Sequence, residues 1–183
     1  MMESCQLFNE NSNKRIIKIP DRYGINLGDP NARHALTAIL NLACPHSKKW
    51  FQDVHQLLIH NVEKGILRVC YKFWNKPKES LFNGNIAQKY IDYQDPQMAV
   101  HFIREVFEKQ EELRKKSSSE DVIQFLKSAL SIGKEADQTI IEGISREVLM
   151  ANIKSVPTLI LDNVAYVGEE QLNRKILESL LKS

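Results

Sequence analysis

The chain has 183 residues, of which 43% are hydrophobic and 26% are charged, and its formal net charge at pH 7 is +2. This composition is typical of a globular protein whose length fits a single domain with one sizeable core. The small net charge gives no electrostatic indication of a nucleic-acid or anionic-membrane partner. No apolar run approaches the roughly 20 residues that are needed to span a bilayer.

The chain begins with a polar stretch, and we expect residues 1–14 to be a tail that precedes one domain over residues 15–183. The start, Met1 to Cys5, does not resemble a secretory signal peptide. The sequence contains three cysteines, so at least one thiol is free or pairs with another molecule. We interpret Cys5 as a surface thiol, with a resolving thiol as the alternative.

An apolar run over residues 34–43 is suited to a buried strand, although its alanine and leucine content would also allow a helix. Pro45 decides the interpretation, because proline is disfavoured inside a helix and favoured at the first helical position. Apolar residues then recur at helical spacing up to Gly65, a residue type that commonly ends helices. We therefore expect Cys44 at the point where a strand ends and a helix begins.

The sequence Cys44-Pro45-His46-Ser47 has the layout of a redox Cys-x-x-Cys motif with serine in place of the second cysteine. Unpaired N–H groups and the helix dipole stabilise a thiolate at a helix start, and the thiolate is the reactive form. His46 would add positive charge, and the Ser47 hydroxyl could donate a hydrogen bond to the sulfur. The alternative is a buried structural cysteine beside a capping serine.

Residues 65–74 alternate as in a strand and contain Cys70, which we interpret as a core thiol. From residue 78 to about 133 the pattern becomes helical, with apolar faces at 98–107 and 122–130. These residues are expected to form an inserted helical subdomain. A third periodic stretch over residues 140–153 is expected to pack on the sheet.

Other chemistries have less support in the sequence. The five histidines lack a paired-ligand spacing with cysteines or acids, so no metal site is predicted. We expect two of them, His55 and His60, on a helix surface. The glycines form no phosphate-binding loop, and no G-x-S-x-G elbow is present.

The C-terminal quarter predicts a hairpin followed by a helix. Residues 156–161 indicate a short strand that is entered through Pro157, Asp162-Asn163 offers a turn, and residues 164–167 pair back. Gly168 precedes a last amphipathic helix. An X-Pro bond in a tight functional turn is also a place where a cis peptide occurs.

In these residues the chain resembles the DsbA-like branch of the thioredoxin-fold thiol-disulfide oxidoreductases. Residues 28–32, the strand, residues 44–51 and residues 155–158 match that family's segments in the family's order. With the helical middle, the resemblance covers nearly the whole chain beyond the tail. It implies an α/β, thioredoxin-like fold with a central mixed sheet and a helical subdomain inserted beside the active-site cysteine.

The resemblance also implies the roles of the site residues. Cys44 would be the attacking thiol, His46 the residue that adjusts its acidity, and Val156-Pro157 a cis-proline turn that faces the sulfur. Ser47 departs from the family pattern and puts ordinary dithiol oxidase activity in doubt. The predicted catalytic residues are Cys44, His46 and Ser47, and the predicted substrate-binding residues are Pro45, Val156 and Pro157.

We therefore expect a thiol-disulfide oxidoreductase or isomerase that acts through one cysteine on cysteine-containing proteins or peptides. No tightly bound cofactor is expected, and glutathione or another small thiol would resolve the mixed disulfide. One alternative is a glutathione-binding transferase of the same fold, in which Ser47 or Cys44 activates glutathione. The other is a non-enzymatic thioredoxin-like module that binds partners beside Pro157.

Two further alternatives concern origin. Ser47 could replace a native cysteine, or the chain could be the excised soluble part of a larger membrane protein with a membrane redox partner. Either would restore an extracytoplasmic dithiol oxidase. The resemblance favours a periplasmic location, although no signal peptide is recognised in the chain.

Overall fold

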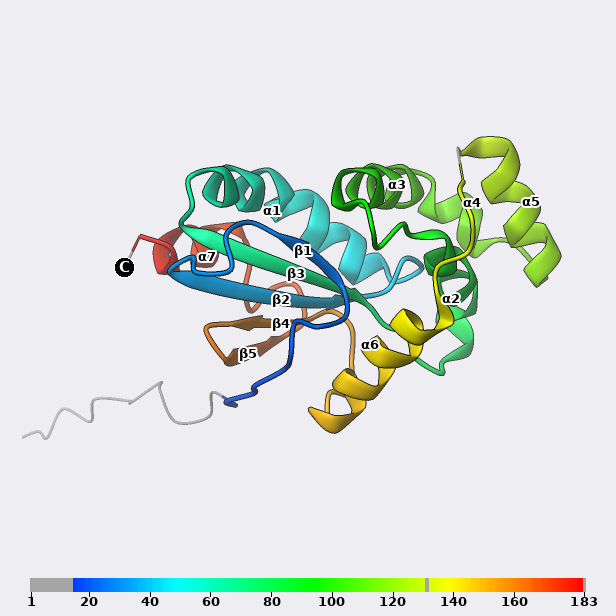
Figure 1. Ribbon diagram of the computed structural model, residues 1–183. Coiled ribbons are helices and arrows are strands. Elements are labelled where there is room, and N and C mark those ends of the chain that lie inside the picture. The colour runs from blue at the N-terminus through cyan, green and yellow to red at the C-terminus, as the bar shows by residue number, and fades with distance from the viewer. Residues whose placement is uncertain (1–14, 131, 183) are drawn as a thin grey trace, which may run out of the picture.

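The computed structural model describes residues 15–130 and 132–182, so the expected tail and Cys5 lie outside the described residues. In the described part of the chain five strands form one mixed sheet in the order β1-β3-β2-β4-β5 (Figure 1). Strands β2 and β3 are parallel, and the other neighbours are antiparallel. The strands are β1 Ile25–Leu27, β2 His34–Leu40, β3 Leu67–Phe73, β4 Thr158–Leu161 and β5 Val164–Val167.

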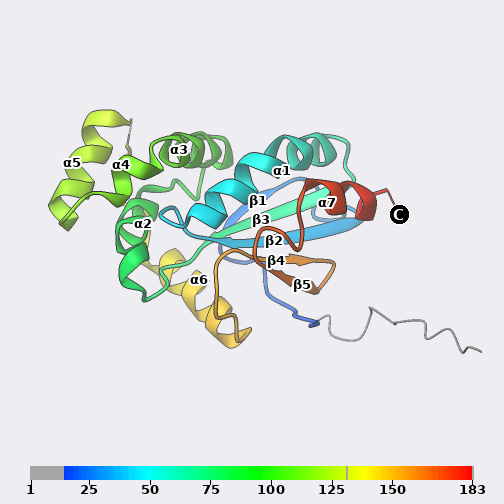
Figure 2. The same ribbon diagram turned by 180° about the vertical axis from the view of Figure 1, so that it is seen from behind.

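Helices cover both faces of this sheet. α1 and α7 lie on one face and α6 lies on the other, as Figures 1 and 2 show from opposite sides. The predicted α/β class with a central mixed sheet is therefore confirmed. The helices are α1 Pro45–Glu63, α2 Phe82–Ala87, α3 Pro96–Glu108, α4 Gln110–Arg114, α5 Ser119–Ala129, α6 Gln138–Met150 and α7 Arg174–Leu180, with short 3-10 turns at Glu79–Leu81 and Gln88–Tyr90.

The strand, turn and helix around Cys44 form where the sequence predicts them. β2 ends at Leu40, and α1 begins at Pro45 with Cys44 as its N-cap residue. Pro45 suits this place because its missing N–H is one that a first helical turn leaves unpaired anyway. At the other end of α1, Gly65 adopts a φ of +69°, a left-handed conformation in which glycine has no Cβ penalty.

The C-terminal hairpin is also present, with shifted boundaries. Asp162 and Asn163 have φ values of +50° and +67°, so a two-residue turn joins β4 to β5. β4 begins only at Thr158, and α7 only at Arg174. α7 starts late because the preceding residues lie along α1, where the Trp50 indole N–H donates to the Leu172 carbonyl at 2.9 Å.

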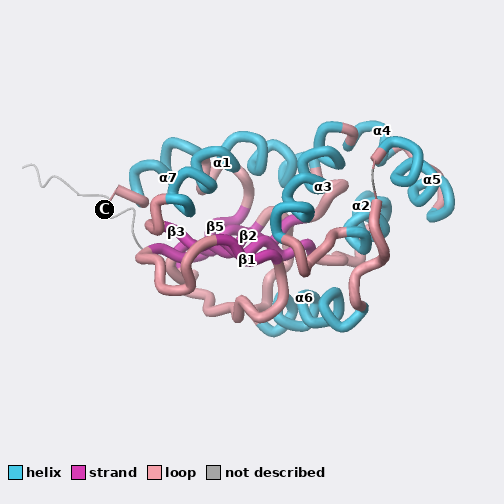
Figure 3. The backbone as a smooth tube through the Cα atoms, turned by 45° about the horizontal axis from the view of Figure 1, so that its top comes forward, coloured by secondary structure: helices cyan, strands magenta, loops and turns pink. Residues whose placement is uncertain are grey.

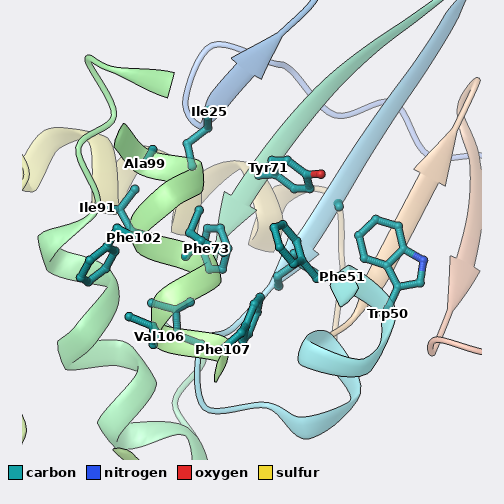
Figure 4. Packing of buried hydrophobic residues seen from close by; sticks show 14 of the residues in the cluster. Ile25, Trp50, Phe51, Tyr71, Phe73, Ile91, Ala99, Phe102, Val106 and Phe107 are labelled. Atoms are coloured by element: carbon teal, nitrogen blue, oxygen red, sulfur yellow. The ribbon is translucent and has the colours of Figure 1, made fainter. Parts of the chain in front are cut away.

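The helical segment α2–α5 extends beyond one end of the sheet (Figure 3). An aromatic contact joins it to the rest of the core: Phe107 of α3 lies 5.3 Å from Phe51 of α1 and 6.5 Å from Phe73 of β3, between ring centroids. Figure 4 shows these rings pointing toward one another between α1, α3 and the sheet. Burial of such large apolar side chains is the main favourable contribution to folding.

The prediction for His55 is wrong, whereas exposed His60 agrees with it. His55 is only 7% exposed, stacks on Phe51 with ring centroids 4.5 Å apart, and hydrogen-bonds through Nδ1 to the Tyr71 hydroxyl at 3.2 Å. The reason is that His55 lies one turn after Phe51 on the side of α1 that faces Tyr71 of β3, so the buried face of α1 is wider than its apolar residues indicate. Burial, with the Arg104 charge as a smaller contribution, lowers the pKa of His55 to about 4.

Candidate active site

Cys44 occupies the junction between the turn after β2 and the start of α1. Its backbone is extended, with φ −83° and ψ 116°, and the residue is 5% exposed. The first N–H groups of a helix have no intrahelical partner, and the dipole adds partial positive charge there. Cys44 therefore stands at the positive end of α1, next to the turn that precedes the helix.

The sulfur of Cys44 lies against the turn that precedes β4. Its Sγ donates to the Val156 carbonyl at 3.6 Å, across 112 positions of sequence. Cys44, Ala43, Leu81 and Val156 form a small apolar cluster. The Val156–Pro157 peptide bond is cis. The fold therefore brings together Cys44, Val156 and Pro157, which the sequence analysis selected.

Ser47 does not take the position that the sequence analysis expected for its hydroxyl. The residue is 0% exposed, and its Oγ accepts the backbone N–H of Asn41 at 3.3 Å. Within residues 15–130 and 132–182, no hydrogen bond joins Ser47 Oγ to Cys44 Sγ. The hydroxyl instead connects the start of α1 to the turn between β2 and Cys44.

His46 lies on the solvent side of the motif and has a partner that sequence reasoning missed. Its side chain is 65% exposed, and Nδ1 hydrogen-bonds to Glu169 Oε1 at 2.8 Å. Lys49 Nζ lies 3.6 Å from the same Glu169 oxygen and 2.7 Å from Glu170 Oε1. The adjacent glutamates after Gly168 signal a charged segment, but only the packing of this segment on α1 shows which of them His46 binds.

These contacts shift the acidity of the charged groups beside the motif. Burial works to raise the pKa of Glu169, but the hydrogen bond from His46 and the charges of His46 and Lys49 lower it in sum. The hydrogen bond and charge of Glu170 raise the pKa of Lys49. The motif therefore starts beside a carboxylate and a lysine that are both ionised at neutral pH.

Buried amide side chains hold the turn that carries Cys44, and the sequence analysis missed them too. Asn41 is 0% exposed, and its Oδ1 accepts the Ala43 N–H at 2.9 Å. Its Nδ2 donates to the Trp74 carbonyl at 3.1 Å and to Asn85 Oδ1 at 2.8 Å. A lone asparagine in an apolar run is a signal of such a role. No comparable signal marks Gln110, which reaches the same turn from α4.

The described residues contain no candidate metal site. In residues 15–130 and 132–182, no group of three or more His, Cys, Asp or Glu side chains is placed to hold a metal ion. In the same residues, no helix is both long and apolar enough to cross a membrane.

A cavity of about 580 Å³ lies along β2 and β3. Cys70 is among the residues that line this cavity, and Cys44 is not.

The thioredoxin family model matches residues 21–183 of the chain. None of the curated proteins matches the chain. Among solved structures, a conserved protein of unknown function from Enterococcus faecalis V583 is 27% identical, with a TM-score of 0.84, and the match covers 90% of this chain and 93% of that chain.

Two further solved structures share the fold at lower identity. A periplasmic thioredoxin-like protein from Salmonella enterica serovar Typhimurium is 15% identical, with a TM-score of 0.59 and coverage of 87% of this chain and 91% of that chain. The thiol-disulfide exchange protein alpha-DsbA2 from Wolbachia pipientis is also 15% identical, with a TM-score of 0.62 and coverage of 87% and 86%. At this identity the likeness shows the thioredoxin-like α/β fold alone.

Proposed function

The chain belongs to the thioredoxin family, and on that premise we propose that it is a thiol-disulfide oxidoreductase that reacts through Cys44. The observation that carries the proposal is the position of the sulfur, at the start of α1 and 3.6 Å from the Val156 carbonyl. The likeness in fold to a solved thiol-disulfide exchange protein from Wolbachia pipientis supports it.

The proposed reaction is thiol-disulfide exchange through a mixed disulfide. The Cys44 thiolate attacks one sulfur of a substrate disulfide, a new sulfur–sulfur bond forms to Cys44, and the other substrate sulfur leaves as a thiolate. A second thiolate then attacks the substrate sulfur of the mixed disulfide and releases Cys44. If that thiolate belongs to the substrate, the substrate is isomerised; if it comes from glutathione, the substrate leaves as a mixed disulfide with glutathione, which a second glutathione reduces.

Each residue near the sulfur has a proposed role in this exchange. Exposed His46 is the residue assigned to adjust the acidity of Cys44. Pro45 and Val156 are assigned to the surface that binds an extended cysteine-containing protein or peptide, and buried Pro157 is assigned to shaping the turn of that surface. Ser47 cannot act as a resolving thiol, so release depends on glutathione, another small thiol or a thiol of the substrate.

A transferase function has less support from the site. A serine that activates glutathione must reach its thiol, whereas the Ser47 side chain is fully buried and bonded to the Asn41 N–H. Disulfide exchange needs only Cys44 from this chain, with the second thiol supplied by glutathione, another small thiol or the substrate. We also propose an extracytoplasmic location, which the likeness to a periplasmic protein from Salmonella enterica supports.

A turnover assay with matched cysteine variants tests the proposal. The whole chain is supplied with a peptide disulfide and reduced glutathione, and peptide reduction and scrambling are followed. Cys44→Ala should abolish the catalysed rate, whereas Cys70→Ala should keep it within about twofold, because a thiol that stays protonated exchanges slowly. Catalysis that persists in folded Cys44→Ala, or that is absent from the unmodified chain, would contradict the proposal.

A further inference from the structure

A buried side chain of the helical segment hydrogen-bonds to the turn that carries Cys44. Gln110, the first residue of α4, is 0% exposed. Its Nε2 donates to the Leu42 carbonyl at 2.8 Å and to the Cys44 carbonyl at 3.1 Å. One amide group therefore joins α4 to the two carbonyls that flank Ala43.

Two N–H groups of this turn, those of Ala43 and Cys44, donate to Asn41. Its side-chain oxygen accepts the Ala43 N–H at 2.9 Å, and its backbone carbonyl accepts the Cys44 N–H at 3.1 Å. The Cys44 carbonyl also accepts the Lys48 N–H at 3.1 Å, the first hydrogen bond of α1. Gln110 thus acts on the same carbonyl that starts the active-site helix.

The helical segment also touches the turn through its backbone. A Cβ atom at Gly84 of α2 would lie 2.2 Å from Asn41 Oδ1 and 2.5 Å from the Ala43 nitrogen, closer than real Cβ contacts come. Only glycine allows this approach. Two separate elements, α2 and α4, are therefore packed directly on the turn.

We propose that Gln110 is a positioning residue that holds Cys44 in its reactive geometry. This inference rests on the proposed function and deepens it, because it gives the helical segment control over the reacting sulfur. Without the amide donor, the Leu42 carbonyl is a buried acceptor without a partner, and the turn moves to relieve that loss. The Cys44 sulfur, two residues further on, then shifts relative to the start of α1 and to the Val156 carbonyl.

The chain offers a matched control for this residue. Gln88 is also a buried glutamine of the segment between β3 and α6, at 2% exposed, but its Nε2 donates to Asn75 Oδ1. In both glutamines the Oε1 atom is buried, with no hydrogen-bond partner among the described residues. The two side chains differ in whether the amide donor reaches the Cys44 turn.

The test is the pH at which alkylation of Cys44 reaches half its maximal rate, measured for Gln110→Met, Gln110→Glu and Gln88→Met. We expect this pH to rise by about half a unit in Gln110→Met, which corresponds to an about threefold smaller thiolate fraction at neutral pH. Gln110→Glu should raise it too, because a buried, protonated carboxyl group donates at most one hydrogen bond to the two carbonyls. Gln88→Met should leave it unchanged.

Equal rises in Gln110→Met and Gln88→Met, or no rise in Gln110→Met, would overturn the inference. If the Gln110 variants do not fold, hydrogen exchange of the unmodified chain decides. Both Nε2 protons of Gln110 should then exchange as slowly as core amides, and rapid exchange would overturn the inference. Alkylation does not require disulfide exchange, so absent turnover with a rise confined to the Gln110 variants would refute the proposed function alone.

Discussion

Cys44 and Cys70 are buried to nearly the same extent, 5% and 4% exposed, but lie in regions of opposite chemical character. Cys44 is the N-cap residue of α1, with its sulfur against the Val156 carbonyl. Cys70 lies inside β3, where burial raises the pKa of its thiol to about 11, despite an opposing contribution from Lys72. The two thiols therefore differ in their surroundings and not in their burial.

The region around Cys70 contributes to stability instead. Next to it in β3, Lys72 is fully buried, and its Nζ lies 2.6 Å from Glu147 Oε2 of α6. The same Nζ donates to the Tyr23 carbonyl. A paired charge in this position fixes α6 on the sheet, and the thiol beside it is a small core side chain.

The largest effect is expected from a substitution that adds a second thiol to the Cys44 region. In Ser47→Cys, the new thiol lies one helical turn from Cys44, so a mixed disulfide of Cys44 with glutathione should be released without added thiol at least about tenfold faster. Ser47→Ala is the control and should retain the adduct. Mass spectrometry of the adduct against time gives the rate, and equal persistence in both variants would mean that position 47 cannot reach the sulfur.

The second prediction concerns the Cys70 region and its ion pair. Glu147→Gln leaves the Lys72 cation buried without its carboxylate, and breaking such a pair costs about 3–5 kcal/mol of unfolding free energy. Glu142→Gln, at an exposed position of the same helix, should cost less than about 0.5 kcal/mol. Urea unfolding measures both, and equal losses would show that the buried pair does not hold α6 in place.

The third prediction uses pH, because His55 of α1 stacks on Phe51, which contacts Phe107 of α3. Its pKa is about 4 in the folded chain and about 6.5 in the unfolded chain, so the unfolded chain takes up the proton first as the pH falls. His55 should therefore remove on the order of 2–3 kcal/mol of stability between about pH 6.5 and pH 4. Over this pH range His55→Gln should lose less stability than the unmodified chain. His60→Gln should lose as much stability as the unmodified chain. A decline of the same size in all three would contradict the buried, neutral state of His55.

The smallest expected effect lies at the edge of the Cys44 region. Glu169→Gln removes the carboxylate that binds His46, so the net charge near the motif becomes more positive and the thiolate is favoured. Alkylation of Cys44 at pH 7 should become about twofold faster, since an exposed charge interaction is weak. Glu170 has a side chain that is 74% exposed, and Glu170→Gln should change the rate less. A slower reaction in Glu169→Gln would reverse the assigned sign.

Sequence patterns were sufficient where local chemistry decides the structure. Pro45 and Gly65 mark the ends of α1, and Asp162-Asn163 gives the hairpin turn, because each residue type has its own backbone preference. Contacts between distant segments could not be predicted in this way. His55 is buried against Tyr71 of β3, and Glu169 reaches His46 across 123 positions of sequence.

In the candidate site, too, the sequence motifs could be predicted, whereas the contacts between distant segments could not. The motif and the proline turn were recognisable as strings, and the fold brings Cys44 next to Val156. The direction of the Ser47 hydroxyl was not predictable, because it depends on the backbone N–H of Asn41, which follows β2 and donates to Ser47 Oγ. Gln110 carries no signal in the sequence, since a glutamine among charged residues ordinarily lies on a helix surface.

The most direct test of the contrast between the two cysteines is to map which sulfur reacts. The whole chain is treated at pH 7 with limiting glutathione disulfide, digested, and analysed by mass spectrometry. We expect glutathione on the peptide that contains Cys44 and an unmodified Cys70. Modification mainly at Cys70 or Cys5, or no modification at Cys44, would contradict the assignment of Cys44 as the exchanging thiol.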